Sequence, residues 1–282
     1  MHPCIGMSFA SFTVDVDRDV NEPRAGHVEG RCRGADGLRF SSTMDGLERL
    51  VRLLGDLDIK ATFFWEGRAA EVLSADHDLK ELMRGHEVAA HGYDHEDLTG
   101  HATGFRPSEE WADAIVGRSL SSLEAVFGTR PEGFRCPYLH IDEGVSRVLM
   151  RRGLRYDSTL FGEIGEGLRP YRLAGNLLEV PLAQCRDPRG RFLQSYLWPL
   201  HEGRRSPEDY DRLLSAHSEG LLVLADHSWH IAESLGGELS RDRAEREIEN
   251  VRKVLQKALC MGHRFMTVSE YLSSCHVGEG KP

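Results

Sequence analysis

Short apolar runs alternate with segments of helical periodicity along most of this chain. Some runs are continuously apolar and others are rich in β-branched and aromatic residues, as buried parallel strands are. The runs lie at 9–16, 60–65, 132–134, 221–225 and 265–268. Between them, apolar side chains recur at i, i+3, i+4 and i+7, which gives a helix one buried face. The alternation predicts an α/β fold, most economically a barrel.

Cap and stop signals delimit the predicted helices. The apolar stripes consist of Leu47, Leu50, Val51 and Leu54; Trp111, Ile115, Leu120, Leu123 and Phe127; Leu213 and Leu214; and Ile248, Val251, Leu255 and Leu259. The start signals are Ser42 or Thr43, Ser108, and Ser206 with Pro207, and the stop signals are Gly128 and Gly262.

The length of 282 residues and the hydrophobic content of 40% suffice for one substantial core. Without an internal repeat or a convincing linker, residues 1–282 are expected to form a single domain, with a flexible tail at 273–282. The segment 18–41 lacks periodicity and is too long for an ordinary connection. Because it follows the first strand, we expect it on the face that carries active sites in α/β barrels. It is interpreted as an insertion that forms a lid or a subunit contact, or that is disordered.

Net charge and the lack of targeting signals limit the classes of partner that we expect. Lys and Arg number 35 against 45 Asp and Glu, a formal net charge of −10. No nucleic-acid partner is expected, since phosphate binding relies on an excess of cationic side chains. The N-terminus has no basic region of the kind that opens an export signal, and the longest apolar run, 221–225, is far below the ~18 residues that span a bilayer. The six cysteines form no CxxC pair. These features predict a cytoplasmic protein with reduced thiols and no membrane partner.

Two acids close the first predicted strand. Strand alternation points Asp15 and Asp17 to the same side. Two carboxylates on one face repel each other, so either a cation lies between them or one of them is protonated. A solvated strand end is the alternative interpretation.

Among the fourteen histidines, His91 and His95 are four residues apart. A single helical turn would place both imidazoles on one face, as a shared metal requires. A pair of surface histidines is the alternative. His86 and His91 are five residues apart, so the HExxH pattern of zinc proteases is absent and Glu87 is not expected to act as their base.

Two more strand ends carry candidate chemistry. Arg135 could bind a carboxylate through both of its terminal nitrogens, and Pro137 fixes a turn that exposes backbone N–H groups. His227 is a candidate proton donor. Each feature alone also fits a structural role. Together, however, one Asp and two His make a three-ligand set that leaves coordination positions for water and substrate, as catalytic zinc sites do, while the second Asp stays free as a base.

The order of these features along the chain resembles the polysaccharide deacetylase family, also called the NodB-homology fold. In sequence order they are TxDxD at 13–17, the His pair, RxPY at 135–138 and the late strand-end histidine. The resemblance extends from about Asp15 to His227. It implies a distorted (β/α) barrel with about seven parallel strands. It also implies a hydrolase that removes an N-acetyl or other N-acyl group from an amino sugar or related carbohydrate by metal-activated water.

The resemblance also implies a cofactor. Asp17, His91 and His95 would bind one divalent metal, in the first place zinc, with cobalt and nickel as alternatives.

The remaining site residues follow from the same resemblance. Asp15 would be the general base and Arg135 the residue that orients it. The backbone N–H of Tyr138 would stabilise the oxyanion, and His227 would protonate the leaving amine as general acid.

The match is not complete. The usual first motif, TFDDG, has adjacent acids, whereas Val16 separates the two acids here. The spacing is similar to a branch that contains peptidoglycan-deacetylase-like proteins and ureide and cyclic-imide hydrolases, some of which work without a metal. His230 is a rival to His227 as the acid. Asp157 lies in a further segment that matches the family and is expected near the cleft, with no assigned partner.

Several functions therefore remain open. Hydrolysis of small linear or cyclic amides on the same fold, with or without a metal, is the main alternative. A 2-His-1-carboxylate set also suits non-haem iron oxygenases, but the α/β alternation argues against the β-sandwich-like fold expected of them. A carbohydrate-binding or assembly protein, built on a catalytic fold that has lost its activity, is disfavoured because every residue type that the chemistry needs is present. The expected partner is a carbohydrate or small amide substrate, and homo-oligomers are allowed.

Overall fold

Twelve strands form one curled sheet in the computed structural model, which describes residues 8–274 of the chain. They are β1 (Ser8–Val16), β4 (Ala61–Trp65), β5 (Glu87–Ala90), β6 (Gly133–Phe134), β7 (Tyr156–Asp157), β8 (Phe161–Glu163), β9 (Tyr171–Ala174), β10 (Leu177–Glu179), β11 (Leu182–Arg186), β12 (Phe192–Gln194), β13 (Leu221–His227) and β16 (His263–Phe265).

The order of neighbours is β12-β11-β13-β1-β4-β5-β6-β7-β10-β9, with β16 also paired to β1 and β8 to β11. Pairing is parallel from β11 through β10 and antiparallel at β12 and β9. The sheet curls into a half-barrel, and the predicted α/β distorted barrel is confirmed. The parallel path has eight described strands where about seven were expected.

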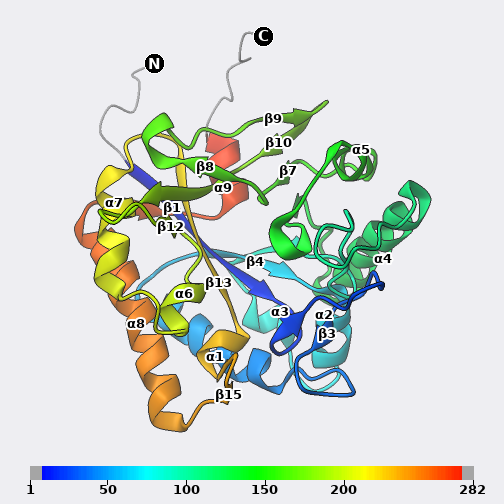
Figure 1. Ribbon diagram of the computed structural model, residues 1–282, viewed down its shortest axis with the longest axis horizontal. Helices are drawn as coiled ribbons and strands as arrows, with labels where there is room; N and C mark the ends of the chain where they lie inside the picture. The colour runs from blue at the N-terminus through cyan, green and yellow to red at the C-terminus, as the bar shows by residue number, and fades with distance from the viewer. Residues whose placement is uncertain (1–7, 275–282) are drawn as a thin grey trace.

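Most of the described helices lie outside the half-barrel (Figure 1). The described helices are α1 (Ser41–Asp56), α2 (Gly67–Leu73), α3 (Leu79–Leu82), α4 (Glu109–Phe127), α5 (Glu143–Arg151), α6 (Trp198–His201), α7 (Asp211–Ala216), α8 (Arg241–Cys260) and α9 (Val268–Ser274). The two longest, α4 and α8, lie on opposite sides of the sheet in Figure 1. Among the described residues, no helix has both the length and the apolarity to cross a bilayer.

Shorter elements complete the fold. Two small hairpins pair β2 (Asn21–Glu22) with β3 (Arg31–Cys32), and β14 (Glu233–Ser234) with β15 (Gly237–Glu238). Four 3₁₀ turns are η1 (Pro137–Leu139), η2 (Ile164–Glu166), η3 (Pro207–Tyr210) and η4 (Trp229–Ile231).

Strand β1 is the centre of the sheet, and its two faces differ in character. Its even-numbered residues, such as Phe12 and Val14, belong to the larger apolar cluster that includes the helices. Asp15 lies on the opposite face, in register with Phe64 of β4 and His227 of β13. Registered partners point to the same face of a sheet. Asp15 and His227 are therefore brought side by side by strand pairing, at the C-terminal end where barrel active sites lie.

Helix α1 has a different N-terminal cap from the one predicted. Ser42 and Thr43 lie inside the helix, and neither caps it. Their backbone N–H groups instead donate to the carboxylate of Asp19, at 3.2 and 2.7 Å. Local sequence signals find caps within a few residues, whereas this cap comes from 22 residues upstream of the helix. Asp19 thereby fixes the start of α1 beside the end of β1.

Three other predictions need correction. Trp111 is 43% exposed and Leu259 is 37% exposed, so neither lies on the buried stripe of its helix. The last strand lies at 263–265, and Val268 begins a further helix, α9, which packs against the apolar cluster inside the barrel. Residues 273 and 274 belong to α9, and the rest of the predicted tail lies outside the described residues.

Glycine at position 46 is required by close packing between α1 and η4. A Cβ added there would lie 1.8 Å from the carbonyl oxygen of Ser228, whereas one added at Gly55 of the same helix would contact nothing within 4 Å. We expect Gly46→Ala to lower the free energy of unfolding by about 1–3 kcal/mol through overpacking. Gly55→Ala should raise it by about 0.5–1 kcal/mol through helix propensity. Urea denaturation of both variants checks this, and equal effects of the two changes would contradict the packing argument.

Candidate metal-binding active site

A pocket of about 290 Å³ opens at the C-terminal ends of the parallel strands. Six polar side chains in its wall matter for the chemistry, namely Asp15, His91, His95, Tyr138, Tyr196 and His227. They come from five separate stretches of the chain. Aromatic and apolar side chains, including Phe161, Trp198 and Trp229, form much of the remaining wall. The mixture of apolar walls and a few converging polar groups is typical of small-molecule sites.

Asp17, His91 and His95 converge beside this pocket. Each offers a ligand atom within 4.8 Å of the other two, and all three residues are buried. Asp17 directly follows the end of β1, and His91 directly follows β5. The pair His91 and His95 does not share a helical turn, as was predicted from its spacing. Positive φ angles of 75° at Gly92 and 52° at His95 fold the loop back instead, so a loop brings the two imidazoles together.

The orientations of His91 and His95 leave one ring nitrogen of each, Nε2, facing the carboxylates as a possible metal ligand. His91 Nδ1 lies 2.8 Å from the backbone carbonyl oxygen of Arg135. A carbonyl can only accept, so Nδ1 carries the proton and the lone pair is on Nε2. That Nε2 lies 3.9 Å from a carboxylate oxygen of Asp15. Nε2 of His95 lies 3.2 Å from Asp17 Oδ2. Both side chains therefore turn Nε2 toward the two carboxylates.

Electrostatics at this cluster favour a cation. Burial raises the pKa of Asp17 well above its usual range, and the nearby carboxylates of Asp15 and Glu66 add to the effect. Its Oδ1 atom is buried without a hydrogen-bond partner. Burial lowers the pKa of His91, and that of His95 to about 3, so both are in the neutral form that binds metals. One carboxylate and two neutral imidazoles with an unsatisfied oxygen are a donor set that fits a divalent cation.

Asp15 has a very different environment, although it is only two residues from Asp17. Arg135 Nη1 donates to its Oδ1 at 2.7 Å, and the Tyr196 hydroxyl lies 2.5 Å from its Oδ2. Burial alone would raise the pKa of Asp15, but Arg135, the nearby histidines and the Tyr196 hydroxyl lower it to about 2. Asp15 is thus an ionised carboxylate held from both sides.

Arg135 is itself fixed by its surroundings. Its Nε donates to the carbonyl oxygen of Ser158 at 2.8 Å, and its guanidinium lies 4.1 Å from the centre of the Phe64 ring. The side chain is completely buried. An arginine held in this way can approach Asp15 in only one geometry.

His227 and His230, the two rival acids, lie in different places. His227 lines the pocket, and its Nε2 is 3.0 Å from the Tyr196 hydroxyl. His230 is fully buried behind the pocket wall, with its ring stacked on His201 at 5.3 Å. Burial lowers the pKa of both imidazoles, to about 3 for His227. Only His227 is placed to meet a substrate in the pocket.

Tyr138 and Leu139 line the pocket with unusual backbone angles. Their φ values are 61° and 56°, in the left-handed region that side chains with a Cβ seldom adopt. The Tyr138 ring packs edge-on against His95, with centroids 4.6 Å apart, and its hydroxyl has no hydrogen-bond partner among residues 8–274. Such strain persists only where the surrounding structure enforces it, commonly at functional sites.

The segment 18–41 contributes directly to the site. Asn21 lines the pocket, and its side-chain amide donates to Asp17 Oδ2. Gly30 packs against the side chains of Tyr138 and His95. A Cβ added at Gly30 would lie 2.7 Å from the Tyr138 hydroxyl and 3.4 Å from His95 Nδ1. Sequence reasoning gave no role to Asn21 or Gly30, because the segment has no periodicity to place them.

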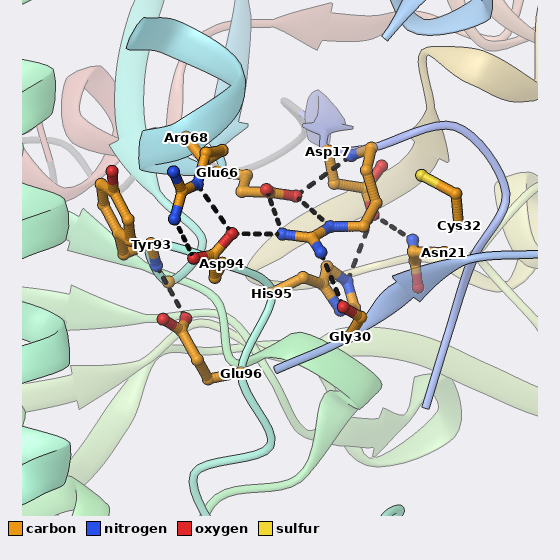
Figure 2. A network of polar contacts seen from close by, with 12 residues as sticks. Asp17, Asn21, Gly30, Cys32, Glu66, Arg68, Tyr93, Asp94, His95 and Glu96 are labelled. Carbon is orange, nitrogen blue, oxygen red and sulfur yellow. Dashed lines mark hydrogen bonds and ion pairs between the residues drawn. The ribbon is translucent and has the colours of Figure 1, made fainter. Parts of the chain in front are cut away.

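A buried ion-pair network fastens this segment to the histidine loop, and Figure 2 shows its members Glu66, Arg68 and Asp94. Arg18 donates to Glu66 through Nη2 at 2.5 Å and through Nε at 3.1 Å, and to Asp94 at 2.8 Å. Its Nη1 donates to the Gly30 carbonyl at 2.6 Å. Arg68 holds the other side of Asp94. Burial opposes the charge, but Glu66 and Asp94 raise the pKa of the Arg18 guanidinium above its ordinary value. Because Arg18 follows Asp17 and Asp94 precedes His95, the network holds two ligands in place.

Asp157 does not line the pocket. It lies in β7 in register with Glu179 of β10, and both carboxyl groups are fully buried. Burial raises the pKa of Asp157 to about 6.

A second buried cluster lies behind His227, where His201 contacts Asp226 and Glu247 at 3.0 Å each. Burial opposes the charge of His201, but the two acids raise its pKa to about 9. Neither cluster lines the pocket.

Part of the chain is similar in sequence to known deacetylases. A family model described as polysaccharide deacetylase matches residues 38–156. A peptidoglycan deacetylase-like protein of Gibberella zeae is 33% identical over 120 residues, which is 42% of this chain and 33% of the relative. This chain spans about one third of the length of the curated relatives it matches.

Two crystal structures show the same fold over nearly the whole chain. A protein from Mycobacterium smegmatis assigned to the polysaccharide deacetylases has a TM-score of 0.60 and 23% identity, covering 96% of this chain and 90% of its own. Puue allantoinase has a TM-score of 0.68 and 16% identity, covering 100% of this chain and 94% of its own.

Proposed function

Because a polysaccharide deacetylase family model matches residues 38–156, we propose that the chain is a metal-dependent hydrolase that removes the N-acetyl group from an amino sugar. The observation that carries the proposal is the convergence of Asp17, His91 and His95 within 4.8 Å, next to a second carboxylate held by Arg135. The name of the Gibberella zeae relative suggests a peptidoglycan-type glycan as substrate. Zinc is the proposed ion, with cobalt and nickel as alternatives, and a cytoplasmic location stays a prediction.

The different environments of the two aspartates fit two different roles in this reaction. Asp17 and the two histidines would hold the cation, and Asp15 would accept a proton from the attacking water. A carboxylate with a pKa of about 2 deprotonates only water that is already acidified, and a bound cation supplies that acidity together with polarisation of the acyl carbonyl. Arg135 keeps Asp15 ionised and oriented.

The other residues complete the hydrolysis. The water oxygen forms the new bond to the acyl carbon, and the backbone N–H of Tyr138 donates to the developing oxyanion. When the carbon–nitrogen bond breaks, His227 donates a ring proton to the nitrogen and is reprotonated by the proton that Asp15 accepted from the water. The products are acetate and the free amine. His227 is preferred to His230 as the acid, because it alone of the two lines the pocket.

Metal analysis combined with an acetate assay tests the proposal. We expect purified protein reconstituted with zinc to hold one equivalent of metal and to release acetate from N-acetylated chitooligosaccharides or peptidoglycan fragments. Asp17→Ala and His91→Ala should each lose the metal and reduce acetate release by roughly 100-fold or more. His77→Ala, at a part-exposed histidine that does not line the pocket, serves as the control and should change neither quantity.

Two results would contradict the proposal. Unchanged metal content in both ligand variants would remove the metal site. Hydrolysis of small cyclic amides that survives exhaustive chelation, without any acetate release from glycans, would favour the amide hydrolase alternative instead.

A further inference from the structure

Tyr196 is a further residue at this site for which the sequence offered no signal. It lies between β12 and α6 and is 7% exposed. Its hydroxyl oxygen is 2.5 Å from Asp15 Oδ2 and 3.0 Å from His227 Nε2. One hydroxyl group thus touches both the proposed base and the proposed acid, which are 212 positions apart in the chain.

The backbone holds Tyr196 rigidly beside His227. Tyr196 forms a parallel bridge with Ala225 of β13. Leu197 N–H donates to the Ala225 carbonyl at 2.7 Å, and Ala225 N–H donates to the Ser195 carbonyl at 3.0 Å. The same strand carries His227 two residues further on. The phenol and the imidazole therefore keep a fixed relation, with ring centroids 4.9 Å apart.

Donor and acceptor counting fixes the direction of both hydrogen bonds. A carboxylate can only accept, and Asp15 already accepts from Arg135 at its other oxygen. The single hydroxyl proton of Tyr196 is therefore donated to Asp15, and the hydroxyl oxygen is left to accept from His227. His227 Nε2 must then carry a proton. Consistent with this tautomer, His227 Nδ1 is buried and has no partner to receive a proton among the residues that the structure describes.

We propose that Tyr196 is a positioning residue that acts through His227, fixing the imidazole in the tautomer with the proton on Nε2 and holding it at a set distance from Asp15. The proposal rests on the proposed function for the role of His227. Trp229 and His230 also pack against the imidazole ring, but among the described residues Tyr196 is the only hydrogen-bond partner of the His227 side chain. Without the hydroxyl, no hydrogen bond in that part of the chain would therefore fix the tautomer.

Tyr196→Phe removes the hydroxyl and keeps the ring. With N-acetylated chitooligosaccharides, we expect kcat to fall roughly 10- to 100-fold through lost positioning, while KM and metal content change little. Tyr156→Phe is a matched control, because the Tyr156 hydroxyl also contacts a carboxylate, Glu87 Oε1 at 2.8 Å, but outside the pocket. That variant should keep the wild-type kcat.

A leaving group that needs no protonation separates an effect on His227 from a general loss of structure. 4-Nitrophenyl acetate releases a stable phenolate, so Tyr196→Phe should lower its turnover much less than that of the oligosaccharide. Adding Tyr196→Phe to His227→Ala should cost almost nothing more, because residues that act as a unit are not additive. Equal losses on both substrates, or additive losses in the double variant, would overturn the proposal.

A measurement that needs no activity keeps the two proposals apart. Nitrogen-15 NMR of histidine-labelled protein should show the Nε2–H tautomer of His227 in the wild type and a shift toward Nδ1–H in Tyr196→Phe. An unchanged tautomer would refute the role of Tyr196 even in an active enzyme. A wild type that hydrolyses neither substrate would refute the proposed function, while the NMR result would still decide whether Tyr196 sets the tautomer.

Discussion

Asp15→Asn is expected to lower kcat for deacetylation by roughly 10²- to 10⁴-fold, the usual contribution of a general base. The amide has the same shape as the carboxylate but does not accept the proton that the attacking water must lose. Because Asp15 is not among the three converging ligands, the variant should keep its bound metal. Steady-state kinetics on N-acetylated chitooligosaccharides, with metal content measured in parallel, checks both statements.

Asp157→Asn is the matched control for this change. Asp157 is as deeply buried as Asp15, but it does not line the pocket. The same replacement there should leave kcat close to the wild-type value in protein that remains folded by circular dichroism. If Asp15→Asn retained more than about a tenth of the activity, well above the range for a lost general base, Asp15 would not be the base.

Glu66→Ala is expected to lower the free energy of unfolding by about 3–5 kcal/mol, the cost of leaving a buried charge without its partner. Arg18 is 2% exposed at its side chain and donates to Glu66 through two side-chain nitrogens. The variant leaves Asp94 as its remaining acidic partner. Since the network holds Asp17 and His95, we also expect weaker metal binding. Urea denaturation and metal titration measure the two effects.

Glu81→Ala is the control for the stability measurement. Glu81 forms an ion pair with Arg84 on the surface, where the side chains are 54% and 77% exposed. Its removal should cost no more than about 1 kcal/mol, because water already solvates both charges. A Glu66→Ala variant as stable as Glu81→Ala would show that the Arg18 network does not hold the site together.

Much of the fold could be predicted from local patterns. The stripe that ends at Gly128 became helix α4, with Ser108 as its cap, and the run at 221–225 became the core of β13. Such features depend on neighbouring residues, so periodicity and end signals locate them. Other predictions of local structure failed. The cap of α1 comes from Asp19, and the histidine pair is brought together by a loop, not a helical turn.

The candidate site, like the fold, could be predicted in part from local patterns. The sequence by itself determined the residue types at the strand ends and their order, from Asp15 and Asp17 through the histidine pair to Arg135 and His227. Motif spacing carries that information, because each motif is local.

Only the tertiary structure decided which of these groups meet and what surrounds them. It gave the two aspartates opposite environments, separated His227 from His230, and brought Tyr196 and Asn21 into the site. The physical reason is strand register. Pairing of β1 with β13 sets Asp15 beside His227, and contacts made across more than 200 residues of chain leave no local pattern from which they could be recognised.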